Sequence, residues 1–126
     1  LYPAVDLVGD YPSRSDFAEG YFLETETMRW FVDRYFPDET ARADWRASPL
    51  RASDHAGLAP AMVLTAGLDP LRDEGAAYAR SLNDAGVAVD ETCYEGVIHG
   101  FLNMGGLVPE ARQALDEVAS WIAAQG

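Results

Sequence analysis

The hydrophobic positions of the chain predict alternating strands and helices. The run Ala61–Ala66 is almost continuously apolar, which is typical of a strand buried on both faces of a parallel sheet. Val87–Tyr94 is a second predicted strand, and the opening residues Leu1–Pro3 have the pattern of the end of a third. Segments with helical periodicity lie between and after these runs.

Three segments have the periodicity of helices. In the first, Thr25–Phe36, apolar residues recur at i, i+3, i+4 and i+7. The second, Glu74–Ala85, has Asp73 as its expected N-cap and Gly86 as its stop. The third begins at Pro109, a residue that suits the first turn of a helix. The positions that this last helix is expected to bury are Leu115, Val118, Ala119 and Ile122.

The order of these elements predicts an α/β fold, with parallel strands and flanking helices. The segment 4–47, an irregular stretch followed by the first helix, is expected to be an excursion that contributes to a substrate pocket. Residues 1–126 are interpreted as one unit, the C-terminal part of a larger domain. Three strands would leave an open apolar edge, which pairs with another chain or aggregates. The missing half of the fold and a second copy of the chain are the two candidate partners.

Charge and hydropathy narrow the range of partners. Nine basic residues, all of them arginine, stand against 21 acidic residues and give a net charge of −12. So acidic a chain repels phosphate groups, which argues against a nucleic-acid partner and against an anionic membrane surface. No apolar run approaches the roughly 20 residues that a membrane span needs. A neutral ester or amide substrate is compatible with this charge.

The cysteine and the two histidines point away from a metal site. Cys93 is the only cysteine, so no disulfide can form within the chain, and this favours a reducing, cytoplasmic location. Because Cys93 falls in a predicted strand, it is expected to be a packed, unreactive thiol. Two histidines and one cysteine without metal-type spacing predict no metal site. His55 lies in a polar loop and is expected to be a solvated surface residue.

Two residues that follow the predicted strands carry the most chemistry. Asp69 comes shortly after the first strand, and Pro70 disfavours a helical conformation for it. His99 lies on a glycine-flanked loop after the second strand, thirty positions further on (99 − 69 = 30). Open α/β sheets bind ligands at the carboxyl edge, where both residues would lie. A carboxylate that accepts from one imidazole nitrogen leaves the other nitrogen free to take a proton from a nucleophile.

Simpler interpretations stand beside this one. Asp69 could merely cap the next turn, and His99 could be satisfied by the loop backbone. Asp73 and Glu74 could form a paired-carboxylate site, but adjacent acids at a helix start are better explained by capping and the helix dipole. Most of the aromatic residues are expected in the core, with an acyl pocket as the alternative. These residues are Tyr21, Phe22, Trp30, Phe31, Tyr35 and Phe36.

Two segments of the chain resemble the motifs of a known family. Asp69–Gly75 reads DPLRDEG and Tyr94–Phe101 reads YEGVIHGF. Together with the thirty-residue step, they closely resemble the C-terminal half of the hormone-sensitive-lipase-like family of α/β-hydrolases. Ser48–Leu50 and Leu1–Pro3 are also similar to that family, so the resemblance covers essentially the whole chain. In the fold that it implies, the triad occurs in the order Ser, Asp or Glu, His.

The resemblance implies a serine carboxylesterase or lipase with Asp69 as the triad acid and His99 as the base. An enzyme of this kind needs no metal or organic cofactor. Leu71, Phe101 and Phe31 are expected to shape the pocket for an ester substrate. The family's oxyanion segment and its Gly-x-Ser-x-Gly elbow do not occur in residues 1–126, so the isolated chain is expected to be inactive. The alternatives are an inactive interaction module and a related lactone or peptide hydrolase.

Overall fold

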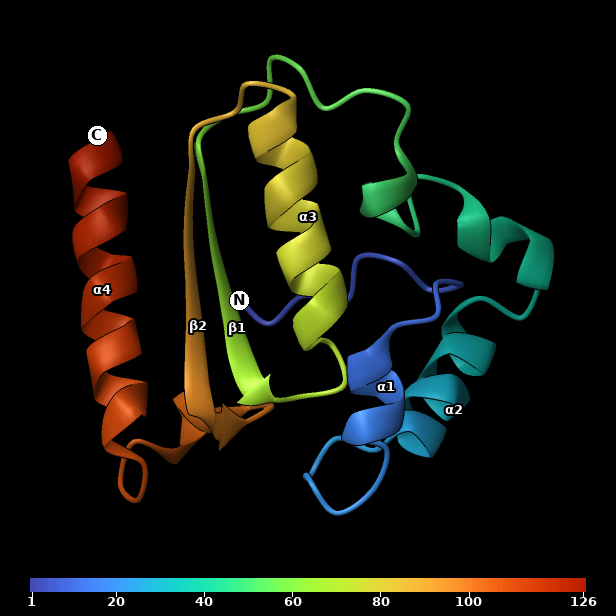
Figure 1. Ribbon diagram of the computed structural model, residues 1–126, viewed down its shortest axis with the longest axis horizontal. Coiled ribbons are helices and arrows are strands. Elements are labelled where there is room, and N and C mark those ends of the chain that lie inside the picture. Colours follow the sequence, from blue (N-terminus) through green and yellow to red (C-terminus); the bar gives the residue numbers. More distant parts are fainter.

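The core of the molecule is a pair of parallel strands, β1 (Ala61–Leu68) and β2 (Val89–Ile98), in a computed structural model that describes residues 1–126 (Figure 1). The register runs from the pair Ala61 and Val89 to the pair Ala66 and Tyr94, and resumes at Leu68 and Ile98. Both strands extend further than their apolar runs predict. As a result β1 ends directly before Asp69, and β2 ends directly before His99.

A β-bulge near the end of the sheet depends on a glycine. The register shifts between Ala66 and Leu68. A Cβ atom at Gly67 would collide with the backbone of Glu95, so no residue with a side chain fits there without a shift of the backbone. The bulge sits two residues before Asp69 and sets the direction in which β1 ends.

Helices cover the two faces of the sheet. Helix α3 (Arg72–Asp84) packs on β1, and α4 (Pro109–Gln125) lies on the other side of the strands (Figure 1). The predicted α/β fold with parallel strands and flanking helices is therefore confirmed. A short 3₁₀ helix, η3 (Phe101–Met104), leads from β2 toward α4. The main hydrophobic cluster lies between the sheet and α4 and contains Leu64, Ala66, Tyr94, Val97, Phe101, Ala111 and Ala114.

The buried face of α4 differs from the predicted one. Leu115 is 48% exposed and Ile122 is 60% exposed, whereas Ala111 and Ala114 are fully buried. Small alanine side chains let the helix approach Phe101 closely, so the helix docks through its first turns. The prediction was wrong for Leu115, Ala119 and Ile122, which are exposed, whereas Val118 is partly buried and packs against the hydrophobic cluster.

The first residues form no strand, contrary to expectation. The N–H of Tyr2 donates to the carbonyl of Leu64, but no ladder follows. Tyr2 has a φ of 34°, a conformation that cannot continue a strand.

Residues 4–47 leave the sheet and carry two helices, α1 (Pro12–Asp16) and α2 (Thr25–Tyr35), followed by the 3₁₀ helix η1 (Glu39–Ala43) (Figure 1). A further 3₁₀ turn, η2 (Pro49–Arg51), leads back toward β1. Helix α2 has no buried residue, and Trp30, Phe31 and Tyr35 are all more than half exposed. The expectation that these aromatic residues form core is therefore wrong, because no other element of the chain covers this face of α2.

Candidate active site

Asp69 and His99 lie side by side at the carboxyl edge of the sheet. The Nδ1 atom of His99 is 2.7 Å from Oδ2 of Asp69. Asp69 is fully buried, while the side chain of His99 is 22% exposed. The contact forms because β1 and β2 are parallel neighbours, so both strands deliver the residue that follows them to the same edge.

The two oxygens of the Asp69 carboxylate have separate tasks. Oδ1 accepts the N–H of Leu71 at 2.8 Å, which closes the turn after Pro70. Oδ2 faces the histidine. Asp69 therefore caps the turn with one oxygen and contacts the histidine with the other.

The geometry assigns opposite roles to the two ring nitrogens of His99. Because an ionised carboxylate only accepts hydrogen bonds, Nδ1 carries the proton and donates to Asp69. The neutral imidazole then has its lone pair on Nε2. A partly exposed Nε2 held in this tautomer can accept a proton from a hydroxyl placed beside it.

Ser13, on α1, clamps the turn that carries Asp69. Its hydroxyl donates to the carbonyl of Pro70 at 2.8 Å and accepts the N–H of Asp73 at 3.3 Å. In return, its own N–H donates to the Asp73 carboxylate at 2.9 Å. Burial acts to raise the pKa of Asp73, but hydrogen bonds from Arg72 and Ser13 outweigh it and hold that pKa below its usual value. Sequence reasoning missed Ser13, since its partners lie 57 and 60 positions away.

Glu74 is a buried structural carboxylate, and the explanation of it as a helix-start charge alone was wrong. Its Oε1 accepts the backbone N–H groups of Val5 at 2.8 Å and Asp6 at 3.2 Å. Its Oε2 accepts from the Arg14 guanidinium, with Nε at 3.0 Å. Burial raises the pKa of Glu74 against the pull of Arg14. The signal in the sequence is that Glu74 shares a helix face with Leu71 and Tyr78.

We expect Glu74→Ala to lower the free energy of unfolding by about 3 kcal/mol, because it leaves a partly buried arginine and two backbone donors without their acceptor. Chemical denaturation followed by circular dichroism measures this loss. Asp44→Ala is the control, because it also removes a carboxylate paired with an arginine, Arg46, but at an exposed site. It should leave the free energy of unfolding unchanged. Equal stability of the Glu74→Ala variant and the unmodified protein would contradict the assignment.

His55 is buried, so its interpretation as a solvated residue was wrong. Its Nε2 lies 3.1 Å from the carbonyl of Pro49, and its Nδ1 lies 3.4 Å from Oγ of Ser81. The Tyr78 ring packs edge-on against the imidazole. These contacts attach the polar loop to α3. The local composition of the loop does not reveal that it packs against this helix. His55 is therefore a structural residue that joins the loop to α3, and it lies outside the candidate active site.

Cys93 fits its expected role as a packed thiol. It is a free, partly buried cysteine in β2, and burial raises the pKa of its thiol. A raised pKa keeps the sulfur protonated and poorly nucleophilic at neutral pH. Nor does the structure bring together three or more His, Cys, Asp or Glu side chains in a way that could hold a metal ion.

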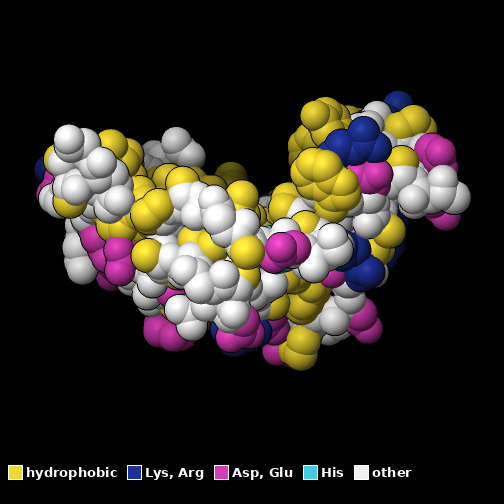
Figure 2. Space-filling model, turned by 90° about the horizontal axis from the view of Figure 1, so that it is seen from above, with side chains coloured by type: hydrophobic (Ala, Val, Ile, Leu, Met, Phe, Trp, Pro, Cys, Tyr) yellow, Lys and Arg dark blue, Asp and Glu magenta, His cyan; other side chains and the backbone are white.

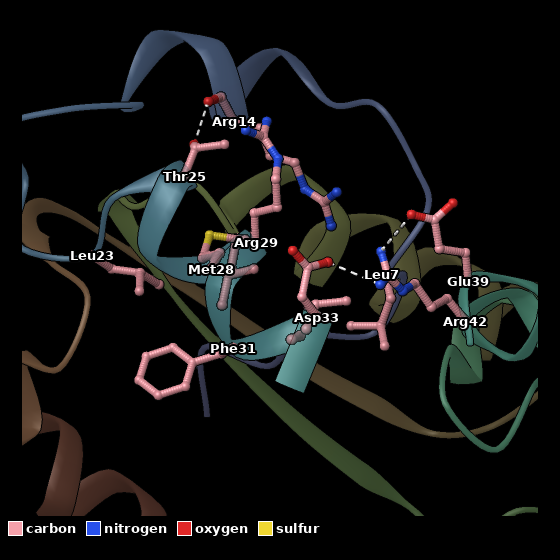
Figure 3. A pocket seen from close by; sticks show the side chains of 13 residues that line it. Leu7, Arg14, Leu23, Thr25, Met28, Arg29, Phe31, Asp33, Glu39 and Arg42 are labelled. Carbon is pink, nitrogen blue, oxygen red and sulfur yellow. Dashed lines mark hydrogen bonds and ion pairs between the residues drawn. The ribbon is translucent and has the colours of Figure 1, made fainter. Parts of the chain in front are cut away.

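A cavity of about 520 Å³ lies between α2, the loop before α1 and the turn after Asp69 (Figure 3). Leu71 and Phe31 both line it, as do Leu23, Met28 and Val32. Arg42 pairs with Asp33 at 2.9 Å at one side of it. Figure 2 shows the molecule hollowed between the α4 end and the α2 end, with hydrophobic side chains gathered at the α2 end. Seven of the thirteen lining residues are hydrophobic, and five are charged: Arg14, Arg29, Asp33, Glu39 and Arg42.

The three residues expected to shape the substrate pocket do not all meet. Leu71 and Phe31 line the same cavity, but Phe101 is fully buried in the core and does not line it. The Phe101 ring packs against Tyr94 with 5.3 Å between centroids. Its position after His99 made it a candidate, but the η3 turn directs its side chain beneath the sheet edge, where it supports the α4 contact.

No helix of the structure is sufficiently long and apolar to cross a membrane.

Comparison with known proteins agrees with this geometry. Residues 1–103 match a family described by the α/β-hydrolase fold. The chain is 43% identical over 115 residues to an ethyl acetate hydrolase of Pseudomonas putida, covering 91% of this chain and 36% of that protein. It is 44% identical over 105 residues to the carboxylic ester hydrolase LipN of Mycobacterium tuberculosis, covering 82% of this chain and 28% of LipN. The chain therefore spans only about a third of the length of these relatives.

Solved structures give the same result. An α/β-hydrolase enzyme from the metagenome of Lake Arreo, Spain, superposes with a TM-score of 0.94 at 47% identity, covering 99% of this chain and 39% of that one. A hyperthermophilic esterase from the archaeon Pyrobaculum calidifontis also gives a TM-score of 0.94, at 39% identity, over 98% of this chain and 41% of that one. With this fold, these motifs and these ester-hydrolase relatives, the chain belongs to the hormone-sensitive-lipase-like family of α/β-hydrolases.

Proposed function

We propose that this chain supplies the acid and the general base of a serine carboxylesterase. The observation that carries the proposal is the 2.7 Å contact between His99 Nδ1 and the buried carboxylate of Asp69. The ester-hydrolase names of the relatives support the reaction class. Residues 1–126 contain no Gly-x-Ser-x-Gly motif, so the nucleophilic serine comes from a segment of the intact protein outside them.

The reaction uses each atom of the pair in turn. Nε2 of His99 takes the proton of the serine hydroxyl as its oxygen attacks the ester carbonyl. The resulting imidazolium passes that proton to the departing alkoxide, and an acyl-enzyme remains. A water molecule, deprotonated by the same Nε2, then attacks the acyl carbonyl, and the serine regains its proton. Asp69 stays ionised throughout and stabilises the imidazolium.

The cavity beside Leu71 is the proposed binding site for one side of the ester. The hydrophobic part of its lining, which includes Leu71 and Phe31, favours a hydrocarbon chain, and its volume of about 520 Å³ suits a small substrate. Leu71 connects the cavity to the catalytic pair, since it follows Asp69 by two residues and donates its N–H to that carboxylate. Phe31, on α2, lines the same cavity.

Shortening Phe31 to alanine should therefore shift the preference of the intact protein toward longer chains. Removing the ring enlarges the cavity, so kcat/KM for an octanoyl ester should rise about tenfold relative to a butyryl ester. The measurement is a chain-length series of p-nitrophenyl esters. Tyr35→Ala, on the same helix but outside the cavity lining, is the control and should leave the ratio unchanged. An unchanged ratio in the Phe31 variant would place the substrate elsewhere.

The first test of the proposal compares the 126-residue chain with the intact protein on a p-nitrophenyl ester of short acyl chain. Activity in the intact protein alone supports the proposal. Activity in the isolated chain would mean that the nucleophile lies within residues 1–126 and would overturn the split of the triad. Activity in neither would favour an inactive interaction module or a related hydrolase of lactones or peptides.

A further inference from the structure

Two residues other than glycine have a positive φ, Tyr2 at 34° and Phe22 at 74°. Bulky side chains rarely adopt this backbone region, and where they do, the surrounding structure holds them there. Such residues cluster at functional sites. Although they lie far from His99 in the sequence, both place an aromatic ring against the turn formed by His99 and Gly100.

Tyr2 contacts the imidazole itself. Its ring centroid lies 4.5 Å from that of His99, and the two planes meet at 60°. The Tyr2 ring also neighbours Phe101, which is fully buried, with 6.1 Å between the ring centroids. The backbone of Tyr2 is fixed to β1, because its N–H donates to Leu64. The tyrosine ring thus contacts both the buried core residue Phe101 and the imidazole of His99.

Phe22 contacts the next residue of the same turn. A Cβ atom at Gly100 would lie 3.3 Å from Cε1 of Phe22, so the phenyl edge covers the backbone there. Gly100 has a φ of 77°, which only glycine adopts readily. The Phe22 side chain is 69% exposed, so it packs on this turn without entering the core.

We infer that Tyr2 and Phe22 form an aromatic bracket that holds the His99–Gly100 turn, and that they are positioning residues for the general base. This inference rests on the proposed function. The single bond to Asp69 fixes the position of Nδ1 but leaves the ring free to rock about the axis of that bond. The Tyr2 ring against the imidazole and the Phe22 ring over the backbone of Gly100 restrict this motion. Nε2 then stays aimed at the hydroxyl that it deprotonates.

The test uses Tyr2→Leu, Tyr2→Phe and Phe22→Ala in the intact protein. Tyr2→Leu should lower kcat about 10- to 100-fold, because misplacing a catalytic group costs this much, while KM stays within about twofold. Phe22→Ala should give a smaller loss, also in kcat. Tyr2→Phe should restore the kcat of the unmodified protein, because the ring makes the contact with His99.

The chain offers a matched control in Tyr78→Leu. The Tyr78 ring packs on His55 at 5.6 Å and 66°, a similar pair outside the site, so its loss should leave kcat unchanged. A kcat at the level of the unmodified protein in Tyr2→Leu, or a loss confined to KM, would overturn the bracket. If Tyr2→Leu does not fold, Phe22→Ala decides alone, since that side chain is exposed. Full activity in His99→Ala would instead overturn the proposed function.

Discussion

The His99→Ala variant of the intact protein should lose ester hydrolysis by about 10⁴-fold or more in kcat, because no other group near Asp69 can take the serine proton. Asp69 is fully buried behind the imidazole and accepts from it at 2.7 Å, so it cannot itself reach a hydroxyl on the open side. The measurement is steady-state turnover of a p-nitrophenyl ester. The loss should fall on acylation, so the initial burst of p-nitrophenol should vanish as well.

The matched control for this experiment is His55→Ala, at the only other histidine. His55 is buried and bonded to the loop backbone at Pro49, so its removal should lower stability and leave kcat close to that of the unmodified protein. If the two variants lose activity equally, the defect is one of folding. If His99→Ala keeps its turnover, His99 is not the general base.

The contact between Asp69 and His99 was predictable because its causes are local. An apolar run fixes each strand, and residues that follow adjacent parallel strands meet at one edge of the sheet. Pro70 after Asp69 and glycine on either side of His99 mark the two turns in the sequence. The strand ends were less predictable, since pairing continues through the bulge at Gly67, where local hydropathy no longer indicates a strand.

The supporting residues were not predictable in this way, because their partners are distant in sequence. Glu74 bonds residues 68 and 69 positions earlier, and Ser13 clamps a turn 57 positions later. His55 becomes buried only when its loop folds back on Ser81. Ser13 and His55 look like ordinary surface residues until the tertiary contact forms, and only Glu74 carries a sequence signal, the helix face that it shares with Leu71 and Tyr78. A polar group can be buried when all its hydrogen bonds are made, and those bonds form only in the folded chain. The local sequence pattern therefore gives little indication of such burial.

The exposed face of α2 shows the opposite failure. Its aromatic residues have the spacing of a buried stripe, and the pattern predicts core. In the structure Phe31 lines a cavity and Trp30 is 53% exposed. Hydrophobic periodicity indicates that one face of a helix favours contact with apolar groups. It does not tell whether those groups belong to the protein or to a substrate.

Replacing Asp69 by asparagine is the second decisive experiment. The amide oxygen can still accept the N–H of Leu71, so the turn and the fold should persist. The amide nitrogen, however, donates where Oδ2 accepted, so His99 Nδ1 must become an acceptor and the proton moves to Nε2. An imidazole in that tautomer has no lone pair for the serine hydroxyl, and kcat should fall about 10⁴-fold.

Circular dichroism and the unfolding midpoint would verify that the Asp69→Asn variant remains folded. Asp73→Asn is the matched control, because Asp73 lies four residues away and bonds Ser13 and Arg72 rather than His99. That variant should keep most of its activity. Near-normal turnover in Asp69→Asn would show that the carboxylate is not needed to orient the base. Loss of turnover in both single variants would mean that the structure of the turn, rather than the tautomer of His99, limits the reaction.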